Sequence, residues 1–149
     1  MSRPTPDSRD RYRVFQPITT RWMDNDIYGH LNNVVYYSLF DTVVNGFLVE
    51  NGLVDPHSGD IIGLVVNSSC HYFAPLAFPQ PIEGGLRVDR IGTSSVTYGV
   101  GIFAKDGETA AAQGGFVHVY VDAASRRPRP LPAAMRKALQ EISDVPQGS

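Results

Sequence analysis

The segment between Trp22 and Tyr36 places an acidic loop directly before a helix-like pattern. Asp26 lies seven residues before Asn33, and Gly29 between them allows the tight turn that would fold the carboxylate back over the helix start. A helix N-terminus carries unpaired backbone N–H groups and about half a positive charge. Such N–H groups can bind a developing oxyanion, while a carboxylate beside them attacks the carbonyl or deprotonates a water molecule. The spacing therefore suits acyl transfer.

The other polar residues of this segment have simpler structural interpretations beside the chemical ones. Asp24 is expected to fix the loop through backbone N–H groups, although it could take the place of Asp26. His30 either has a structural role or orients Asp26 or a substrate. Asn32 and Asn33 are suited to cap the helix, which is compatible with an oxyanion site. Asp24, Asp26 and His30 could bind a metal, but the helix terminus already supplies an electrophilic group, so we predict neither a metal nor a cofactor.

The helix itself is predicted over 33–51. Its polar residues follow helical spacing, and nearly everything else in the segment is apolar, which predicts a helix buried on most sides. Gly52 fits the position after its C-terminus. The polar residues are Ser38, Asp41, Thr42 and Asn45.

Strands are predicted on both sides of this helix, and a short helix after them. One strand precedes the long helix and four follow it, three of them joined by short turns as an antiparallel meander. Pro132 fits the first turn of the short helix, whose apolar face holds Met135, Leu139 and Ile142. The strands are predicted over 12–20, 61–73, 82–91, 96–104 and 109–122.

The element order predicts an α+β fold: a five-stranded antiparallel sheet wrapped around a long central helix, plus a short C-terminal helix. A chain of 149 residues fits one domain, which we place at 12–143, with flexible tails at 1–11 and 144–149. One curved sheet covers only part of an apolar helix, so we expect a second copy of the chain to cover the rest.

Residues 26–36 also resemble a known family. They match the pattern D-x-x-G-H-x-N-N-x-x-Y of hotdog-fold acyl-CoA thioesterases of the 4-hydroxybenzoyl-CoA thioesterase type, and the similarity extends over about 12–142. The resemblance implies acyl-CoA hydrolysis at the subunit interfaces of a homodimer, often paired into a homotetramer. It also implies that Asp26 is the catalytic carboxylate and that the backbone N–H of Asn33 polarises the thioester carbonyl. His30 has a supporting role in this reading, and we expect Asn32 and Tyr36 to contact the substrate.

Coenzyme A phosphates need cations, for which Arg87, Arg90 and the stretch Arg126-Arg127-Pro128-Arg129 are the candidates. The net charge of −2 argues against nucleic acid as the main partner. No apolar run approaches the length of a membrane span, and 1–11 has no apolar core of a secretory signal, so we expect a cytoplasmic protein without a membrane partner.

Two other functions fit the same sequence. A hydratase or dehydratase acting on acyl thioesters would use His30 with a carboxylate as acid and base, and would release no thiol. A non-catalytic acyl-CoA-binding module is the second. Neither a G-x-S-x-G nucleophile elbow nor a glycine-rich phosphate loop is present, which argues against α/β-hydrolase chemistry.

Overall fold

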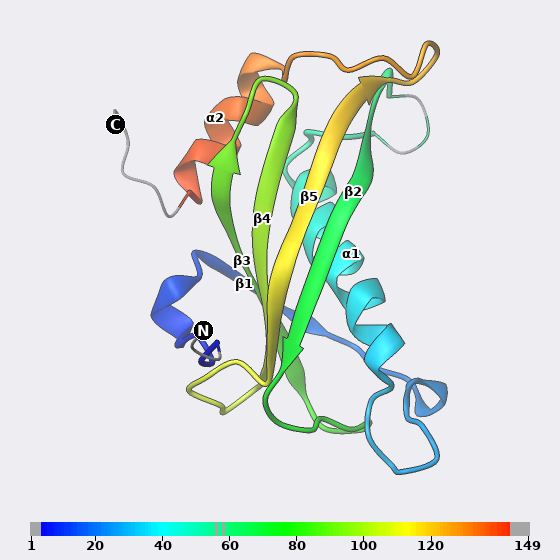
Figure 1. Ribbon diagram of the computed structural model, residues 1–149, viewed down its shortest axis with the longest axis vertical. Coiled ribbons are helices and arrows are strands. Elements are labelled where there is room, and N and C mark those ends of the chain that lie inside the picture. The colour runs from blue at the N-terminus through cyan, green and yellow to red at the C-terminus, as the bar shows by residue number, and fades with distance from the viewer. Residues whose placement is uncertain (1–3, 56, 58, 144–149) are drawn as a thin grey trace.

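A computed structural model describes residues 4–55, 57 and 59–143. Five antiparallel strands form one sheet in the order β1-β3-β4-β5-β2 (Figure 1). The meander of β3, β4 and β5 lies at the centre, and β1 and β2 form the two edges. These strands confirm the predicted sheet, with bounds β1 Val14–Ile18, β2 Ile61–Tyr72, β3 Ile82–Ile91, β4 Ser95–Ala104 and β5 Ala112–Asp122.

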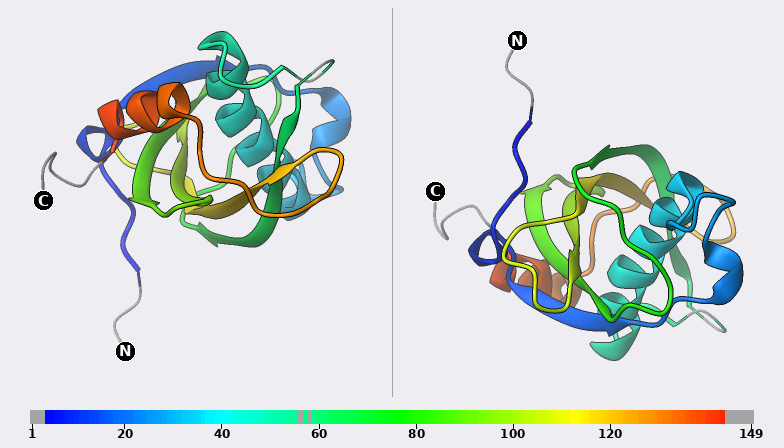
Figure 2. Two further views of the ribbon diagram at one scale, coloured as in Figure 1. Left: turned by 90° about the horizontal axis from the view of Figure 1, so that it is seen from above. Right: turned by 90° about the horizontal axis from the view of Figure 1, so that it is seen from below.

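The long helix α1 (Asn33–Glu50) lies in the concave face of this sheet, which curves around it (Figure 2). Its buried residues follow helical spacing from Tyr36 to Leu48, and Phe40, Val43 and Val44 are fully buried. The predicted polar positions are all exposed. In a single chain the sheet covers only part of the helix, as expected: Val34 and Val49 lie outside the stripe that faces the sheet and are 70% and 47% exposed.

The short helix α2 (Ala133–Glu141) confirms the predicted C-terminal helix. Its buried residues Met135 and Leu139, together with Ile142 just after it, join the same apolar core as α1. The Ile142 carbonyl accepts a hydrogen bond from the backbone of Val88, which attaches the end of α2 to β3. The sheet, α1 and α2 therefore share one core.

The N-terminal segment lies against the convex face of the sheet. We expected a flexible tail up to Arg11, but Asp7 forms an ion pair with Arg87 at 3.0 Å, and the Arg9 guanidinium lies 4.9 Å from the centre of the Phe103 ring. Charge pairing and cation–π contact hold this segment in place. Residues 1–3 and the expected C-terminal tail, 144–149, lie outside the described residues. No helix that the structure describes is long and apolar enough to cross a membrane.

Candidate active site

Asp24 organises the loop that leads into α1. Its side chain is buried and accepts hydrogen bonds from the backbone N–H of Arg21 at 2.8 Å and from the Arg21 guanidinium at 2.9 Å. Burial alone would raise the pKa of the Asp24 carboxyl, but these hydrogen bonds lower it. The Asp24 carbonyl accepts a bond from the Asn32 N–H. Asp24 is thus committed to the loop, as expected for a structural role.

Asp26 is held by a tight turn that ends at His30. The Asp26 N–H donates to the His30 carbonyl at 2.8 Å, and Gly29 has a φ of +82°, a conformation that favours glycine. Oδ1 of Asp26 accepts backbone hydrogen bonds from Tyr28 at 2.8 Å and from His30 at 3.4 Å. Oδ2 has no hydrogen-bond partner among the described residues. One carboxylate oxygen is therefore fixed and the other is available.

The N–H groups in the first turn of α1 differ in their partners. Asn32 caps the helix, because its Oδ1 accepts from the Val34 N–H at 3.0 Å. Its backbone carbonyl accepts from the Val35 N–H at 2.9 Å. The Asn33 N–H donates to no atom of the described residues. A ligand oxygen can therefore accept from Asn33 where the positive end of the helix dipole lies.

The Asn33 carbonyl is fixed from the sheet. The Tyr72 hydroxyl, at the end of β2, donates a hydrogen bond to it at 3.0 Å. The Tyr72 ring also packs edge-on against Tyr36, with ring centres 5.1 Å apart. Burial raises the pKa of the Tyr36 hydroxyl to about 12, so this group stays neutral. The end of β2 thus holds the first turn of α1 in position.

These groups border one open cavity of about 400 Å³. Four of the residues predicted for the site line this cavity: Asp26, His30, Asn33 and Tyr36. Asn32 does not line it but caps the helix that does. Nothing in the sequence indicates which end of β2 meets the start of α1, so the position of residues 72–75 beside this cavity is visible only in the structure. The lining consists of Asp26, His30, Leu31, Asn33, Tyr36, Tyr72, Phe73, Ala74 and Pro75.

The candidate arginines do not border this cavity. Arg87 is paired with Asp7 at 3.0 Å and with Asp89 at 2.7 Å, and its guanidinium lies over the Tyr12 ring. Its charge is therefore already compensated, which argues against a phosphate contact. Arg90 is exposed near the end of β3, away from the start of α1 (Figure 1). The loop with Arg126 and Arg127 also lies at that far end of the molecule.

The described part of the chain contains no group of three or more His, Cys, Asp or Glu side chains that could hold a metal ion. Asp24, Asp26 and His30 are close in sequence, but the Asp24 carboxylate faces Arg21. That the reaction needs no metal ion stays a prediction.

Comparison with known proteins supports the fold and identifies the family. Residues 20–139 match the model of the thioesterase-like superfamily. The PA5185 protein from Pseudomonas aeruginosa is 53% identical, with 96% of this chain and all of that chain aligned at a TM-score of 0.92. A thioesterase from Thermus thermophilus, solved with coenzyme A and Zn, is 26% identical over 92% of this chain and 99% of that one, with a TM-score of 0.74.

A more distant structure shares the fold alone. The 1,4-dihydroxy-2-naphthoyl-CoA thioesterase from Synechocystis is 18% identical, with 89% of this chain and 98% of that one aligned at a TM-score of 0.77. No match was found among curated protein sequences.

Proposed function

The chain belongs to the thioesterase-like superfamily, and we propose that it hydrolyses acyl-CoA thioesters at the cavity between Asp26 and the start of α1. The observation that carries the proposal is the pairing of two uncommitted groups in that cavity. These are Oδ2 of Asp26 and the backbone N–H of Asn33.

The proposed reaction needs only these two groups and water. The thioester oxygen accepts a hydrogen bond from the Asn33 N–H, which stabilises the negative charge that develops on it. As a nucleophile, the Asp26 carboxylate displaces the thiolate and forms a mixed anhydride, which water then hydrolyses to the free acid. As a general base, it takes a proton from water while that water attacks the carbonyl and the thiolate leaves. Both routes give one acid and one coenzyme A.

A relative solved with coenzyme A supports coenzyme A as the thiol part of the substrate. A thioesterase 26% identical to this chain was solved with coenzyme A. The cavity walls carry Tyr36, Tyr72 and Phe73, which suit either an aromatic or an aliphatic acyl group. His30 borders the same cavity and is close enough in sequence to support Asp26 or the substrate.

We further propose that the active form is a homodimer joined at the free edge of β2, which can pair again into a homotetramer. Leu64, Val65 and Val66 on this edge strand are 38%, 46% and 58% exposed, an apolar surface that a second β2 strand would cover. A two-fold axis would place the two β2 strands antiparallel. The start of β2 in the partner would then lie beside Tyr72, at the site.

A panel of acyl-CoA substrates with thiol detection tests the proposed function. Short aliphatic, long aliphatic and aromatic acyl-CoA should be compared, together with enoyl-CoA to detect hydration of a double bond. We expect at least one class to release free coenzyme A in step with free acid. Hydration of enoyl-CoA without thiol release would favour the hydratase alternative, and binding without turnover of any substrate would favour the binding module.

A further inference from the structure

The turn that carries Asp26 is closed by a pair of residues at its base. Asn25 and Leu31, which flank the turn on either side, form an antiparallel backbone bridge. Inside this base, the Asp26 N–H donates to the His30 carbonyl at 2.8 Å. Leu31 is buried and Asn25 is half-buried. The position of the Asp26 carboxylate in the cavity therefore depends on the contacts that hold Asn25 and Leu31.

The segment 73–81, which connects β2 to β3, holds both residues of this base. The Leu31 N–H donates to the Leu76 carbonyl at 2.7 Å. The side-chain amide of Asn25 makes two hydrogen bonds to Phe78: Oδ1 accepts from the backbone N–H at 3.0 Å, and Nδ2 donates to the backbone carbonyl at 3.3 Å. Because an asparagine amide has its acceptor oxygen and its donor nitrogen on opposite sides of one plane, these two bonds together fix its orientation.

The same segment begins at the residue that positions Asn33. Tyr72, whose hydroxyl donates to the Asn33 carbonyl, immediately precedes it. The Phe73 N–H donates to the Ala111 carbonyl at 2.8 Å, which fixes the start of the segment to the residue before β5. One short segment thus connects the start of α1 with the turn that carries Asp26.

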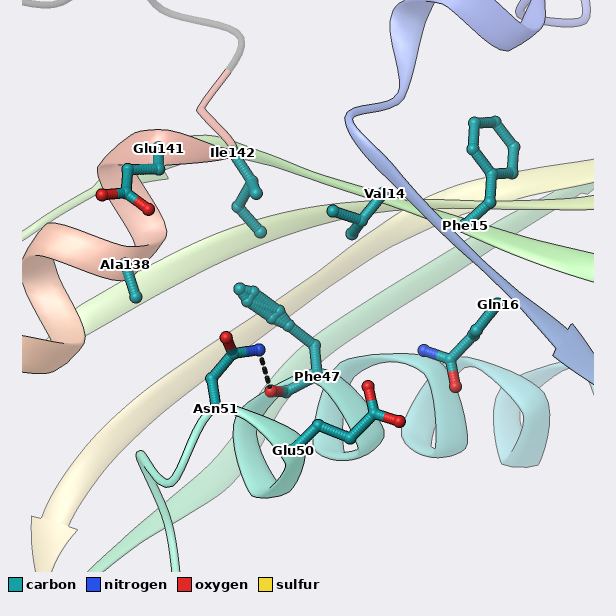
Figure 3. Close-up of a pocket in the computed structure, with 9 residues that line it drawn as sticks. All are labelled: Val14, Phe15, Gln16, Phe47, Glu50, Asn51, Ala138, Glu141 and Ile142. Carbon is teal, nitrogen blue, oxygen red and sulfur yellow. Dashed lines mark hydrogen bonds between the residues drawn. The ribbon is translucent and has the colours of Figure 1, made fainter.

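Asn51 provides a comparison at the other end of α1. Its side-chain amide donates to the carbonyl of Phe47, four residues before it, at 2.8 Å (Figure 3). Both residues line a second cavity, of about 240 Å³, which lies away from Asp26. The amide of Asn25, in contrast, bonds to a residue fifty-three positions away in the sequence. Each asparagine binds a backbone group, but the bond of Asn51 joins no part of the candidate site.

We propose that Asn25 is a positioning residue that sets the spacing between the Asp26 carboxylate and the Asn33 N–H, an inference that rests on the proposed thioester hydrolysis. Asn25 does not line the cavity, so it acts through Asp26 rather than on the substrate. Its two bonds hold the turn of Asp26 on the segment whose start positions Asn33. The spacing matters because displacement of a reacting group by about 1 Å can lower a rate on the order of 10²-fold.

The first test compares two changes of the same kind. Asn25→Leu removes both hydrogen bonds and keeps the approximate size of the side chain. On the best substrate of the acyl-CoA panel, kcat should fall roughly 10- to 100-fold, as for two lost hydrogen bonds, with KM little changed because the cavity lining is retained. Asn25→Ala removes the same bonds without adding an apolar group and should give the same loss. Asn51→Leu, the matched control, should lower Tm and leave kcat unchanged.

A double variant tests whether Asn25 and Tyr72 act on the same spacing. Tyr72→Phe removes the hydrogen bond to the Asn33 carbonyl. Because both changes release one spacing, the fall in kcat for Asn25→Leu combined with Tyr72→Phe should be smaller than the product of the two single falls. Asn51→Leu combined with Tyr72→Phe should show only the fall of Tyr72→Phe.

Heteronuclear NMR of the free protein measures the positioning without a substrate. In Asn25→Leu, the backbone signals of residues 26–33 should shift and broaden, as expected for motion on the microsecond to millisecond timescale, whereas Asn51→Leu should leave them unchanged. If the parent protein hydrolyses no acyl-CoA while these signals are disturbed in Asn25→Leu, the proposed function fails and the structural part of the inference stands. Undiminished kcat in Asn25→Leu of an active parent, equal falls in Asn25→Leu and Asn51→Leu, a double-variant fall equal to the product, or undisturbed signals of residues 26–33 would overturn the inference.

Discussion

The two oxygens of the Asp26 carboxylate have different surroundings, and this difference is the basis of the proposed chemistry. Oδ1 accepts two backbone N–H groups of its own turn, which fix the carboxylate plane. Oδ2 is left for the substrate or water. The sequence predicts that Asp26 and Asn33 come together, since the seven-residue spacing is short enough and Gly29 allows the tight turn. Which oxygen is free could not be predicted, because it depends on the backbone angles of residues 28–30.

His118 is a second residue whose surroundings determine its behaviour. It lies on β5, 2% exposed, with Nδ1 3.2 Å from the Tyr120 hydroxyl, which in turn lies 2.7 Å from the Tyr98 hydroxyl. Nε2 is buried without a hydrogen-bond partner among the described residues. Burial lowers the pKa of His118 from 6.5 to about 4, because the charged imidazolium would lose its hydration.

This burial predicts acid sensitivity in a defined range. Below pH 6.5 the unfolded chain takes up a proton at His118 that the folded chain refuses until about pH 4. The free energy of unfolding should therefore fall as the pH falls from 6.5 to 4, by about 3 kcal/mol, and this contribution should be absent above that range. Denaturant unfolding of His118→Phe should lack this part of the decline. An equally steep decline in the variant would contradict the assignment.

At the scale of elements, the end of β2 and the start of α1 form one unit through Tyr72. Helical periodicity predicts α1 and alternation predicts the meander, but neither shows which ends of β2 and α1 meet. The hydrogen bond from Tyr72 to the Asn33 carbonyl is therefore visible only in the folded chain. It positions the residue whose N–H is proposed to bind the thioester oxygen.

Removal of this hydrogen bond should reduce catalysis more than binding. Tyr72→Phe keeps the ring contact with Tyr36 and deletes the hydroxyl. We expect kcat to fall about three- to tenfold, the worth of one hydrogen bond of roughly 0.5–1.5 kcal/mol, with KM little changed. Tyr37→Phe, a hydroxyl deletion on α1 outside the cavity lining, is the matched control. Equal kcat values for Tyr72→Phe and the parent would show that Tyr72 does not position the helix start.

At the scale of the whole molecule, the free edge of β2 predicts self-association. Val66→Glu would place like charges near the two-fold axis of the proposed dimer, whereas Val49→Glu changes an exposed valine on α1 away from the sheet edge. Sedimentation at low micromolar concentration should show a dimer or tetramer for the parent and for Val49→Glu, and a monomer for Val66→Glu. A stable, active monomer of the parent protein would contradict the proposed assembly.

In the same assembly, the loop with Arg126 and Arg127 could contact a substrate that it cannot reach within one chain. Arg129 forms an ion pair with Asp60, just before β2, at 3.2 Å. In an antiparallel pair, this loop of the partner subunit would approach the site, and its exposed Arg126 and Arg127 side chains could meet coenzyme A phosphates. Replacing both by alanine should raise KM for acyl-CoA, most clearly at low salt. KM for the corresponding acyl-pantetheine, which lacks the nucleotide, should not change, and an equal rise for both substrates would contradict this role.

The sequence was informative where local rules determine structure and less so where distant contacts do. Element order and apolar spacing were sufficient for the sheet around α1. The contacts of Arg87 with Asp7 and of Arg9 with Phe103 join segments about eighty or more residues apart. No local pattern indicates such pairs, which is why Arg87 could be taken for a phosphate ligand and 1–11 for a flexible tail.

The most direct test of the central claim is the turnover of Asp26→Asn on the best substrate of the acyl-CoA panel, measured beside Asp24→Asn. Asp26→Asn keeps the shape of the side chain and removes its charge, so kcat should fall by on the order of 10²–10⁴ while substrate binding and oligomeric state persist. Asp24→Asn should lower kcat much less and act mainly on stability, because Asp24 holds Arg21. Near-normal turnover in Asp26→Asn, or greater loss in Asp24→Asn, would contradict the assignment of Asp26 as the catalytic carboxylate.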